Sequence, residues 1–463
     1  MKVVTEISTQ TKLRAITEQR PADLLTPVSL YLKLRDRFPG SILLESADNQ
    51  EGRNSRSFIA FDRIATISAT ADSTVIETTS NVREDRSGDP FEILQQFIDS
   101  FSFDAPNKGN GLFGYISYDA VQFIEPSVGI KSPGDLPLFQ FSLFRFVVEF
   151  DHLRHTLTIN QYMQDDGEAV SLPGELFNGI SGAVYPFRIS GEESADISAD
   201  DFKQNVIRAK EHCARGDVFQ VVLSRKFTQA FTGDEFNVYR ALRMINPSPY
   251  LFFADFRDFT LFGSSPEAQL ISRNGIAEIH AIAGTYRKTG DAAIDRNAAE
   301  RLKQDAKENA EHVMLVDLAR NDLSRFCSKV EVNQFREVHN YSHVIHLVSK
   351  VTGEVNGAAA VEQIAQVLPA GTLSGAPKVR AMQIINANER SLREWYGGCI
   401  GTIGFDGSVN MAILIRTFMS RNNELQYRAG AGIVIDSDPE SELKETEYKL
   451  GALRAALKQA LNL

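Results

Sequence analysis

The chain has 463 residues, of which 43% are hydrophobic and 24% are charged, so it can form two or three domains or one large intertwined unit with a sizeable core. Its 49 basic and 60 acidic residues give a net charge of −11. This balance argues against a nucleic-acid partner, because phosphate binding needs a basic surface. It remains compatible with a small anionic substrate, since a pocket can be locally positive in an acidic protein.

The cysteines and the lengths of the apolar runs indicate in which cellular compartment the protein is found. The three cysteines, Cys213, Cys327 and Cys399, are odd in number, far apart and without a CxxC motif, which is typical of reduced thiols. Residues 1–12 are polar and lack the apolar stretch of a signal peptide, and no run is long enough to span a membrane. We therefore expect a cytoplasmic protein that does not bind a membrane.

The first part of the chain alternates helical and strand patterns. Helical spacing occurs at 28–37 and 91–101, whereas β-branched and aromatic residues favour strands at 41–46, 57–79, 111–124 and 136–150. The acidic segment 189–201 has few apolar residues and predicts an exposed linker. We expect an N-terminal half at 1–188 and a C-terminal half at 202–463, with the two halves intertwined.

The second part begins with a predicted helix at 202–214, which Ser198 or Asp200 caps and Gly216 ends. Strand patterns follow at 218–227 and 250–265, and the remainder alternates strands and long helices without a steady β-α-β rhythm. The sequence therefore predicts an α+β fold, with large antiparallel β-sheets packed together and helices outside them.

Two pairs of glutamates stand on predicted helices. Glu308 and Glu311 share one face of a helix predicted over 298–326, and Glu442 and Glu445 share a stripe with Lys449 on a helix that Asp438 caps. Carboxylates at this spacing repel each other unless a cation such as Mg²⁺ lies between them. The alternative is an ordinary solvated face, and the spacing by itself favours that alternative for both pairs.

Other candidate residues are equally ambiguous when taken one at a time. The glycine-rich segments 369–382, 396–408 and 429–433 either admit an anionic ligand or form tight turns. Arg416, in a strand predicted over 411–418, needs an anionic partner such as a substrate carboxylate. His346 is either a general acid or base or a core histidine with satisfied hydrogen bonds.

Taken in order, these segments resemble the chorismate-utilising enzyme family. The resemblance covers 199–463 and rests on GDVFQVVLSRKF, NPSPYLFF, FGSSPEAQL, AIAGTYRKTG, ENAEHVMLVDLARNDLSRF, YSHVIHLVSKVTGEV, PAGTLSGAPKVRAMQII, WYGGCIGTIGFDGSVNMAILIRT and AGAGIVIDSDPESELKET. In the N-terminal half it is weaker and rests on SILLESAD and NSRSFIAF. Each motif is moderate evidence, but their order is highly specific.

The resemblance implies a magnesium-dependent site for chorismate. Glu311 and Glu445 match the Mg²⁺ ligands, with Glu308 and Glu442 as supporting ligands. The residues that match substrate-binding positions are Tyr396, Arg416, Gly430, Gly432, Lys449, Ala283, Gly284 and Thr285. Glu267 matches the acid that protonates the departing 4-hydroxyl group, and His346 and Thr372 match a pair implicated in pyruvate elimination.

Two positions indicate which nucleophile, water or ammonia, attacks chorismate and which product forms. Family members that use water carry lysine where this chain has Gln220, and members that make aminodeoxychorismate carry lysine where it has Ala283. The pair therefore resembles the members that combine chorismate with ammonia to form anthranilate and pyruvate, the first committed step of tryptophan biosynthesis. Ala281, where the family usually has proline, departs from the pattern near Ala283.

Other functions within and beyond this reaction remain open. Because the chain contains no glutaminase motif, we expect free ammonia or a separate glutamine amidotransferase subunit as the nitrogen donor. The alternatives are an aminodeoxychorismate synthase component, a variant that stops before pyruvate is released, and a non-catalytic chorismate-binding relative. The retained glutamates, together with Lys449, Arg416 and His346, argue against a non-catalytic protein.

A regulatory site is also implied by the resemblance. SILLESAD resembles the family's tryptophan-binding strand and NPSPYLFF its partner loop, which makes Glu45, Ser46, Pro249, Tyr250 and Leu251 the candidate residues for feedback inhibition by tryptophan. Glu45 or a nearby backbone carbonyl is expected to meet the amino group. Without the resemblance, the same segments are a plain core strand and a proline turn.

Overall fold

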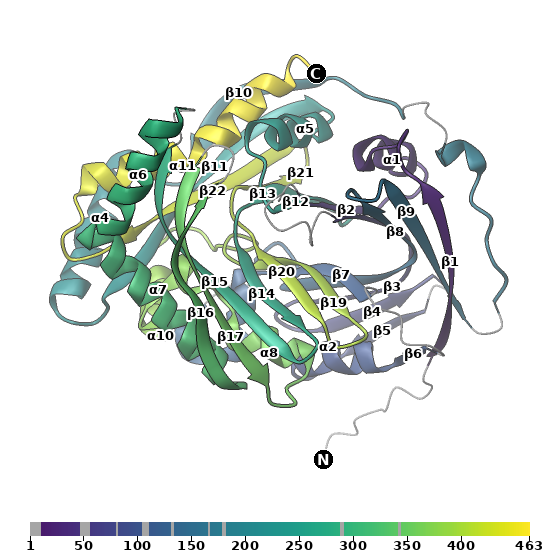
Figure 1. The fold of residues 1–463 in the computed structure, drawn as a ribbon, viewed down its shortest axis with the longest axis horizontal. Coiled ribbons are helices and arrows are strands. Elements are labelled where there is room, and N and C mark those ends of the chain that lie inside the picture. The colour runs from purple at the N-terminus through teal and green to yellow at the C-terminus, as the bar shows by residue number, and fades with distance from the viewer. Residues whose placement is uncertain are drawn as a thin grey trace.

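The computed structural model describes residues 11–46, 56–79, 82–103, 111–130, 134–164, 167–177, 182–287, 291–340 and 344–463. The predicted α+β fold is confirmed: hydrogen-bonded antiparallel strands fill the interior, and helices lie outside them (Figure 1). Among the described strand pairs, β1 with β6 is parallel. No helix among the described residues is both long and apolar enough to cross a membrane.

A long run of paired strands forms one side of the fold. In spatial order it contains β6 (Phe101–Phe103), β1 (Thr11–Pro21), β9 (Thr156–Gln164), β8 (Phe139–Asp151), β3 (Arg56–Ala69), β2 (Ile42–Glu45), β12 (Tyr250–Asp255), β13 (Thr260–Ser265), β21 (Thr417–Arg421), β22 (Glu424–Ile433), β11 (Gln220–Gly233) and β10 (Phe187–Ala195). The strands β4 (Thr74–Thr78) and β5 (Arg83–Arg86) extend from β3, and β18 (Gly375–Ala376) pairs with β11.

A second run starts from the long strand β8 and forms the other side. It contains β7 (Gly111–Ile116), β19 (Cys399–Gly404), β20 (Val409–Ile413), β14 (Ala268–Arg273), β15 (Ile276–Arg287), β17 (Val344–Val355) and β16 (Cys327–Asn340). Because β8 pairs with β3, β7 and β9, it joins the two runs.

The two halves of the chain share this network. The N-terminal strand β2 pairs with β12, and the N-terminal strand β7 pairs with β19. The boundaries at 188 and 202 stay a prediction. The segment 189–201 is not an irregular linker, however, because Phe187–Ala195 forms β10 against β11. Its side chains are mostly exposed, which is why the composition of this strand resembles that of a linker.

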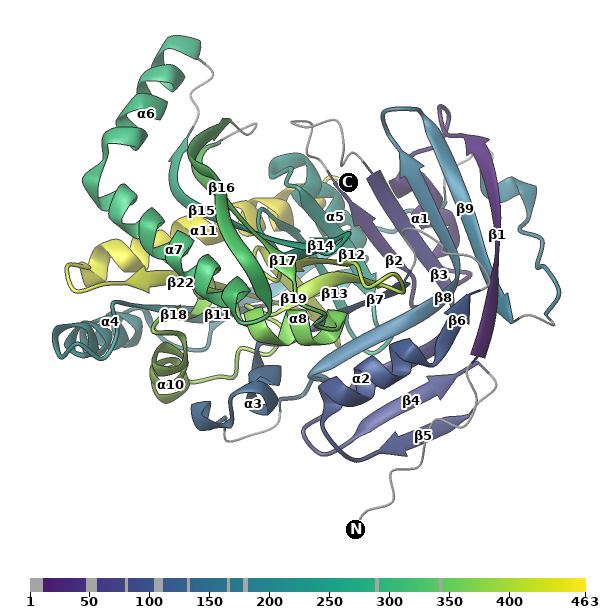
Figure 2. The ribbon, with the colours of Figure 1, turned by 60° about the horizontal axis from the view of Figure 1, so that its bottom comes forward.

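The helices lie around the strands, as the tilted view in Figure 2 shows. They are α1 (Pro27–Leu34), α2 (Pro90–Asp99), α3 (Val121–Ile124), α4 (Ala199–Ala214), α5 (Phe236–Ile245), α6 (Ala292–Gln304), α7 (Ala306–Ser324), α8 (Ala360–Val367), α9 (Gly371–Ser374), α10 (Lys378–Asn388) and α11 (Pro439–Ala460), with short 3₁₀ turns at Tyr118–Ala120, Pro126–Val128 and Gly174–Phe177.

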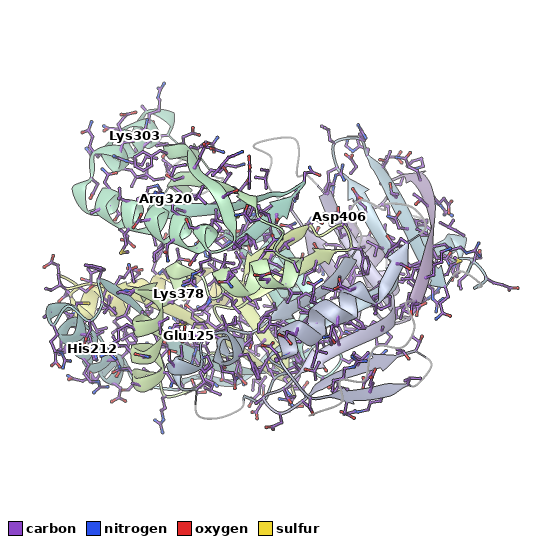
Figure 3. All side chains as sticks on the ribbon, turned by 90° about the horizontal axis from the view of Figure 1, so that it is seen from below. Glu125, His212, Lys303, Arg320, Lys378 and Asp406 are labelled. Atoms are coloured by element: carbon purple, nitrogen blue, oxygen red, sulfur yellow. The ribbon has the colours of Figure 1, made fainter. Side chains whose placement is uncertain are left out.

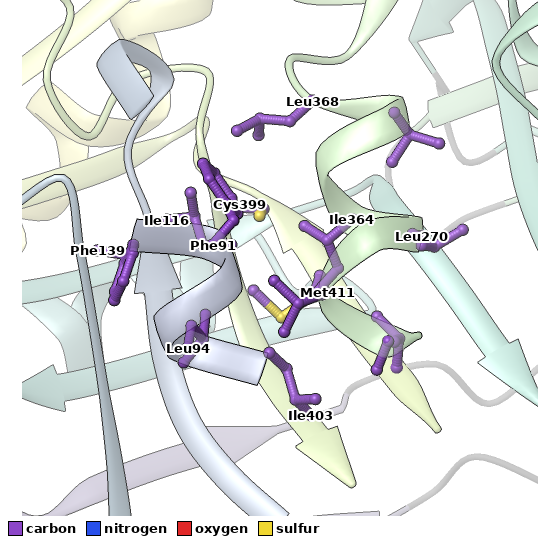
Figure 4. Close-up of a cluster of buried hydrophobic side chains, with 14 of the residues drawn as sticks. Phe91, Leu94, Ile116, Phe139, Leu270, Ile364, Leu368, Cys399, Ile403 and Met411 are labelled. Atoms are coloured by element: carbon purple, nitrogen blue, oxygen red, sulfur yellow. The ribbon is translucent and has the colours of Figure 1, made fainter. Parts of the chain in front are cut away.

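A large apolar cluster fixes α2 and α8 against the hairpin of β19 and β20 (Figure 4). Phe91 and Leu94 reach in from α2, and Ile364 from α8. They meet Ile403 and Met411 of the hairpin, both with no exposed surface. This burial holds the second run of strands in place beneath its helices.

Capping residues explain where two helices that carry or flank the site begin. The side chain of Ser198 accepts a hydrogen bond from the Asp201 N–H at 3.0 Å at the start of α4, and that of Asp438 accepts one from the Ser441 N–H at 2.9 Å at the start of α11. Both caps were predicted and are confirmed. Gly216, at φ +78°, follows α4 in the left-handed conformation that favours glycine.

The helix predicted over 298–326 is two helices, α6 and α7. Asp305 is extended, with φ −67° and ψ 115°, and its carboxylate accepts the Glu308 N–H at 3.0 Å, so it ends α6 and caps α7. The apolar spacing in this segment predicts a buried stripe of Leu302, Ala306, Ala310, Val313, Met314 and Leu318. In the structure Val313 is 49% exposed, whereas Leu315 and Ala319 are buried. Packing of α7 against β15, β16 and β17 therefore buries a different face of the helix from the one that the spacing of apolar residues predicts.

Candidate active site

Glu267 lies in the short connection between β13 and β14, where the Thr372 hydroxyl of α9 donates a hydrogen bond to its carboxylate at 3.0 Å. Burial raises the pKa of Glu267 to about 7, against the lowering effects of Thr372, Arg416 and Lys449. A carboxyl group with this pKa holds a proton near neutral pH, so it can act as a general acid.

Arg416 lies between β20 and β21 and not within a strand as predicted. Its backbone is left-handed, with φ +51°, and its carbonyl accepts the Ser264 N–H at 3.2 Å. Its guanidinium makes no hydrogen bond or ion pair with the residues that the structure describes, although it is close enough to Glu267 to lower the pKa of that acid. A strained, partly buried cation of this kind suits an anionic ligand.

Two glycines of β22 let neighbouring side chains approach the strand. A Cβ atom on Gly430 would lie 3.0 Å from the Tyr396 hydroxyl oxygen, and one on Gly432 would lie 2.7 Å from the Gln220 amide nitrogen. The Lys449 ammonium donates to the Gly430 carbonyl at 2.9 Å. The structure therefore brings together Tyr396, Gln220 and Lys449 around one stretch of β22. Burial raises the pKa of Tyr396 to about 12, which keeps its hydroxyl protonated.

The glutamates predicted to bind a metal lie on two helices beside this stretch. The Gln220 amide donates to the Glu311 carboxylate of α7 at 3.3 Å, and Glu445 of α11 forms a 2.8 Å ion pair with Lys449. Glu442 is buried on α11 and Glu308 is partly buried on α7. Within the described ranges, no three carboxylate or imidazole groups lie close enough together to hold a metal ion, so the four glutamates are not gathered into one set.

The chemistry of these side chains nevertheless fits Mg²⁺, which prefers carboxylate oxygens and keeps several water ligands. Glu311 and Glu445 are each held on one side by an amide or an ammonium group, and both remain partly accessible. The pairs thus supply suitable oxygen donors from α7 and α11, where Glu311 contacts Gln220 and Glu445 contacts Lys449.

His346 is buried on β17, where it pairs in register with Thr285 of β15 and His339 of β16. Ala283 pairs with Leu347, and the register shifts at the intervening Gly284. The backbone of the predicted substrate-binding segment 283–285 therefore lies beside His346. The side chains of 283–285 lie outside the described residues.

A large cavity of about 620 Å³ lies next to the predicted tryptophan residues. It is lined by Glu45, Ser46, Pro249, Tyr250 and Leu251 together with residues of β3, β7, β14, β15, β16, β17, β19 and β20. Register brings the two motifs together, because Glu45 pairs with Leu251. Leu44 lies between Phe252 and Phe58 on neighbouring strands and forms an apolar part of the wall.

The carboxylate of Glu45 is already engaged with other side chains. The Tyr239 hydroxyl donates to it at 2.5 Å and Arg243 donates at 3.0 and 3.1 Å. A backbone carbonyl, the second option of the prediction, is therefore the better receptor for an amino group. One of Leu43 and Leu44, which strand alternation places on opposite faces, was expected to line an indole pocket, and Leu44 is the one that lines the cavity. The sequence analysis missed Arg56 as a cation at the cavity.

At the other end of this cavity lies a charged cluster that the sequence analysis also missed. Glu278 of β15 contacts His280 and Lys350, each at 2.5 Å. Burial raises the pKa of Glu278, but the hydrogen bonds and charges of His280 and Lys350 outweigh it and hold that pKa below its ordinary value. No local sequence signal joins Lys350 to Glu278, because they meet only through the pairing of β15 with β17.

Comparison with known proteins agrees with this geometry. The model of the chorismate binding enzyme family matches residues 40–455, and the chain therefore belongs to that family. It is 38% identical over 461 residues to anthranilate synthase component 1 of Aquifex aeolicus, covering 95% of this chain and 93% of that protein. It is 35% identical to the Bacillus subtilis protein of the same name, over 95% of this chain and 91% of that one. Within the family it is an enzyme of the anthranilate synthase component 1 group.

Solved structures show the same fold. Anthranilate synthase component I from Streptococcus pneumoniae is 29% identical, with a TM-score of 0.76 over 94% of this chain and 99% of that one. The menaquinone-specific isochorismate synthase of Escherichia coli has a TM-score of 0.75 at 19% identity, covering 98% of this chain and 96% of that chain. The second likeness bears on the fold alone.

We predict that Thr372→Val raises the pKa of Glu267 above about 7. The Thr372 hydroxyl stabilises the charged carboxylate, so its loss favours the protonated form and extends that form to higher pH. Infrared titration of the protonated carboxyl stretch measures this, with Glu267→Gln to assign the band. Thr372→Ser keeps the hydroxyl and is the control. An unchanged or lowered pKa in Thr372→Val contradicts the prediction.

Proposed function

We propose that this enzyme converts chorismate and ammonia into anthranilate and pyruvate, in the cytoplasm, as the first committed step of tryptophan biosynthesis. The observation that carries the proposal is the pairing of a protonated acid, Glu267, with a nearby arginine, Arg416, that makes no ion pair with the described residues. Chorismate offers a poor leaving group that needs a proton and carboxylates that need cations.

Glu267 and the residues around it have separate roles in the proposed reaction. Glu267 donates its proton to the 4-hydroxyl group, the C4–O bond breaks, and the hydroxyl leaves as water while ammonia adds at C2 and releases a proton. Arg416, Tyr396 and the Gly432 backbone hold the enolpyruvyl carboxylate, and the lack of a side chain at Gly430 and Gly432 lets Tyr396 and Gln220 approach β22. His346 and Thr372 assist the later loss of pyruvate, in which the ring becomes aromatic.

Gln220 has an amide where a water-activating base would be needed, which favours ammonia as nucleophile. Its side chain donates a hydrogen bond to Glu311 and lies against Gly432, next to residues proposed to bind Mg²⁺ and substrate. The relatives' name, component 1, supports a second component, which we propose to be a glutamine amidotransferase subunit that supplies the ammonia.

Glu311 and Glu445 would hold Mg²⁺, with Glu308 and Glu442 supporting them. When bound, Mg²⁺ supplies positive charge that stabilises electron density on the ring carboxylate of chorismate. Lys449 bridges Glu445 and the Gly430 carbonyl, so it keeps the α11 carboxylate beside β22 in readiness for that ion.

The proposal predicts the product. Purified protein given chorismate, Mg²⁺ and an ammonium salt should form anthranilate, measured by fluorescence and mass, and not isochorismate or 4-amino-4-deoxychorismate. Ala283→Lys should reduce anthranilate formation, because an amine there can trap the intermediate. A wild-type protein that makes mainly the para-amino product would identify an aminodeoxychorismate synthase, and one that makes no product from chorismate would support a non-catalytic relative.

Glu445→Gln should abolish turnover of chorismate while leaving the fold intact, because it removes one charge from an ion with few protein ligands. The matched control is Glu440→Gln, an exposed glutamate of the same helix that pairs with Lys203 at 3.4 Å. Activity is measured against Mg²⁺ concentration, and folding by circular dichroism. Wild-type rates in Glu445→Gln, or full activity of the wild type in excess chelator, would refute the metal assignment.

We also propose that tryptophan inhibits the enzyme from the 620 Å³ cavity. Leu44, Phe58 and Phe252 offer an apolar wall for an indole. Arg56, which is ion-paired with Glu149 and half exposed, offers a cation that a ligand carboxylate can share. Because β2 and β12 come from different halves, a ligand between them contacts both. Inhibition requires that tryptophan bind more tightly to an inactive arrangement than to the active one.

Ser46→Phe should fill this part of the cavity and give an active enzyme that tryptophan no longer inhibits. Chorismate turnover against rising tryptophan is measured for the wild type, for the variant, and for Ser127→Phe, an exposed serine outside the cavity. Equal inhibition of wild type and Ser46→Phe places the effector elsewhere. No inhibition of the wild type at millimolar tryptophan removes the regulatory proposal.

A further inference from the structure

A second, much smaller cavity lies behind Glu267. Its volume is about 30 Å³, which is room for roughly two water molecules at about 10–15 Å³ each. Glu267, Gln269, Asp322, Thr372 and His280 line it together with apolar residues of β14, β15, α7 and the segment that leads into α9. A polar cavity of this size is suited to ordered water.

The wall opposite Glu267 is a buried polar network. The Lys378 ammonium donates to the Asp322 carboxylate at 2.7 Å and to the Val367 carbonyl at 3.2 Å, and the Gln269 amide donates to the same carbonyl at 2.9 Å. The Lys378 and Asp322 side chains are 8% and 6% exposed. Figure 3 shows where Lys378 lies relative to Arg320 of α7.

Two oxygens of this network lack a partner among the described residues. They are Asp322 Oδ1 and Gln269 Oε1, and both are buried. Buried oxygens without a hydrogen bond are costly, and bound water is the usual way in which proteins satisfy them. Both residues line the cavity, so water there can reach the network on one side and Glu267 on the other.

We propose that water in this cavity connects Glu267 with the Asp322–Lys378 pair, and that this pair is a positioning group that controls the protonation of the acid. The inference rests on the proposed reaction. Glu267 loses its proton to the departing hydroxyl, and the cavity water then passes a proton to its carboxylate while accepting another, so that the water is unchanged. The proton released when ammonia adds balances the proton consumed, so no other reactant is needed.

Other charged groups face Glu267 and the Asp322–Lys378 pair, and they determine how the pair affects the protonation of Glu267. Glu267 also faces Arg416 and Lys449, and His280 at the cavity is paired with Glu278, which Lys350 contacts as well. Burial raises the pKa of Asp322 above its ordinary value, and the positive charges of Lys378 and Arg325 oppose that rise. The pair is electrically balanced, so removing either partner leaves a net charge of known sign near the cavity.

The simplest alternative is that the pair only ties α7 to α10. The neighbouring helix α9 also packs tightly on α7, since a Cβ atom on Gly371 of α9 would lie 2.9 Å from Leu318 of α7. A structural tie predicts that loss of either partner weakens folding and activity in the same direction. A charge that acts through water on Glu267 predicts opposite shifts of the pH profile.

The test compares Asp322→Asn with Lys378→Met. Activity requires protonated Glu267, so the rate falls as pH rises through its pKa. Asp322→Asn leaves the ammonium and should move this fall to lower pH, whereas Lys378→Met leaves the carboxylate and should move it to higher pH, each by about one unit. The matched controls are Asp317→Asn and Arg320→Met, an exposed 3.2 Å pair on α7, which should leave the profile unchanged.

Shifts in the same direction, or profiles that equal the wild type, would overturn the proposal. Infrared titration of Glu267 gives the same comparison without turnover, so a wild type that makes no anthranilate would refute the proposed function separately. If the single variants do not fold, a high-resolution crystal structure of the wild type decides. Water bonded to Asp322 or Gln269 in the cavity supports the proposal, and a dry cavity overturns it.

Discussion

Hydrogen bonding between strands of the two halves is the constraint on which the site depends. β2 is paired with β3 on one side and β12 on the other, and β7 is paired with β8 and β19. Backbone groups buried in a sheet must be paired, so neither half completes its strand network alone. The same pairing fixes β13 and β14, and hence the connection that carries Glu267.

That connection lies between the 620 Å³ cavity and the 30 Å³ cavity. Pro266 lines the large cavity, Glu267 lines the small one with Thr372, and Ala268 lines both. Successive residues of an extended chain point to opposite sides, which accounts for this division. A ligand that displaces Pro266 or Ala268 therefore also displaces Glu267, so an effector in the large cavity can influence catalysis without contact with the substrate.

Local signals were sufficient for much of the fold but not for the site. Caps at Ser198 and Asp438 and the alternating strand patterns depend on neighbours in sequence, and the structure confirms them. The left-handed backbone at Arg416 and the exposure of Val313 depend on packing between distant segments, so periodicity gave the wrong element or face. The roles of Glu267 and Glu311 came from the family resemblance, and the Asp322–Lys378 pair, 56 residues apart, had no signal at all.

The candidate site has a rigid wall around Arg393 and an accessible wall around Glu445 and Lys449. The two walls differ because the first is buried and the second is exposed. Arg393 is fully buried, where it bonds Glu389 at 2.7 Å and the carbonyls of Leu373 and Val222 at 2.5 and 2.7 Å, so it fixes α9 against β11. Breaking a buried pair of this kind costs about 3–5 kcal/mol. The Glu445–Lys449 pair is 46% and 44% exposed, so it adds little stability and its geometry can change.

This asymmetry would let one scaffold serve the two electrostatic tasks of the proposed reaction. Proton donation needs a fixed, poorly solvated carboxyl group, which the buried wall provides at Glu267. Cation binding needs carboxylates that can approach from α7 and α11, but their negative charges oppose that approach. A divalent cation would cancel this repulsion, and because the carboxylates lie on the accessible wall they can adjust to it without disturbing the buried ion pairs that orient the acid.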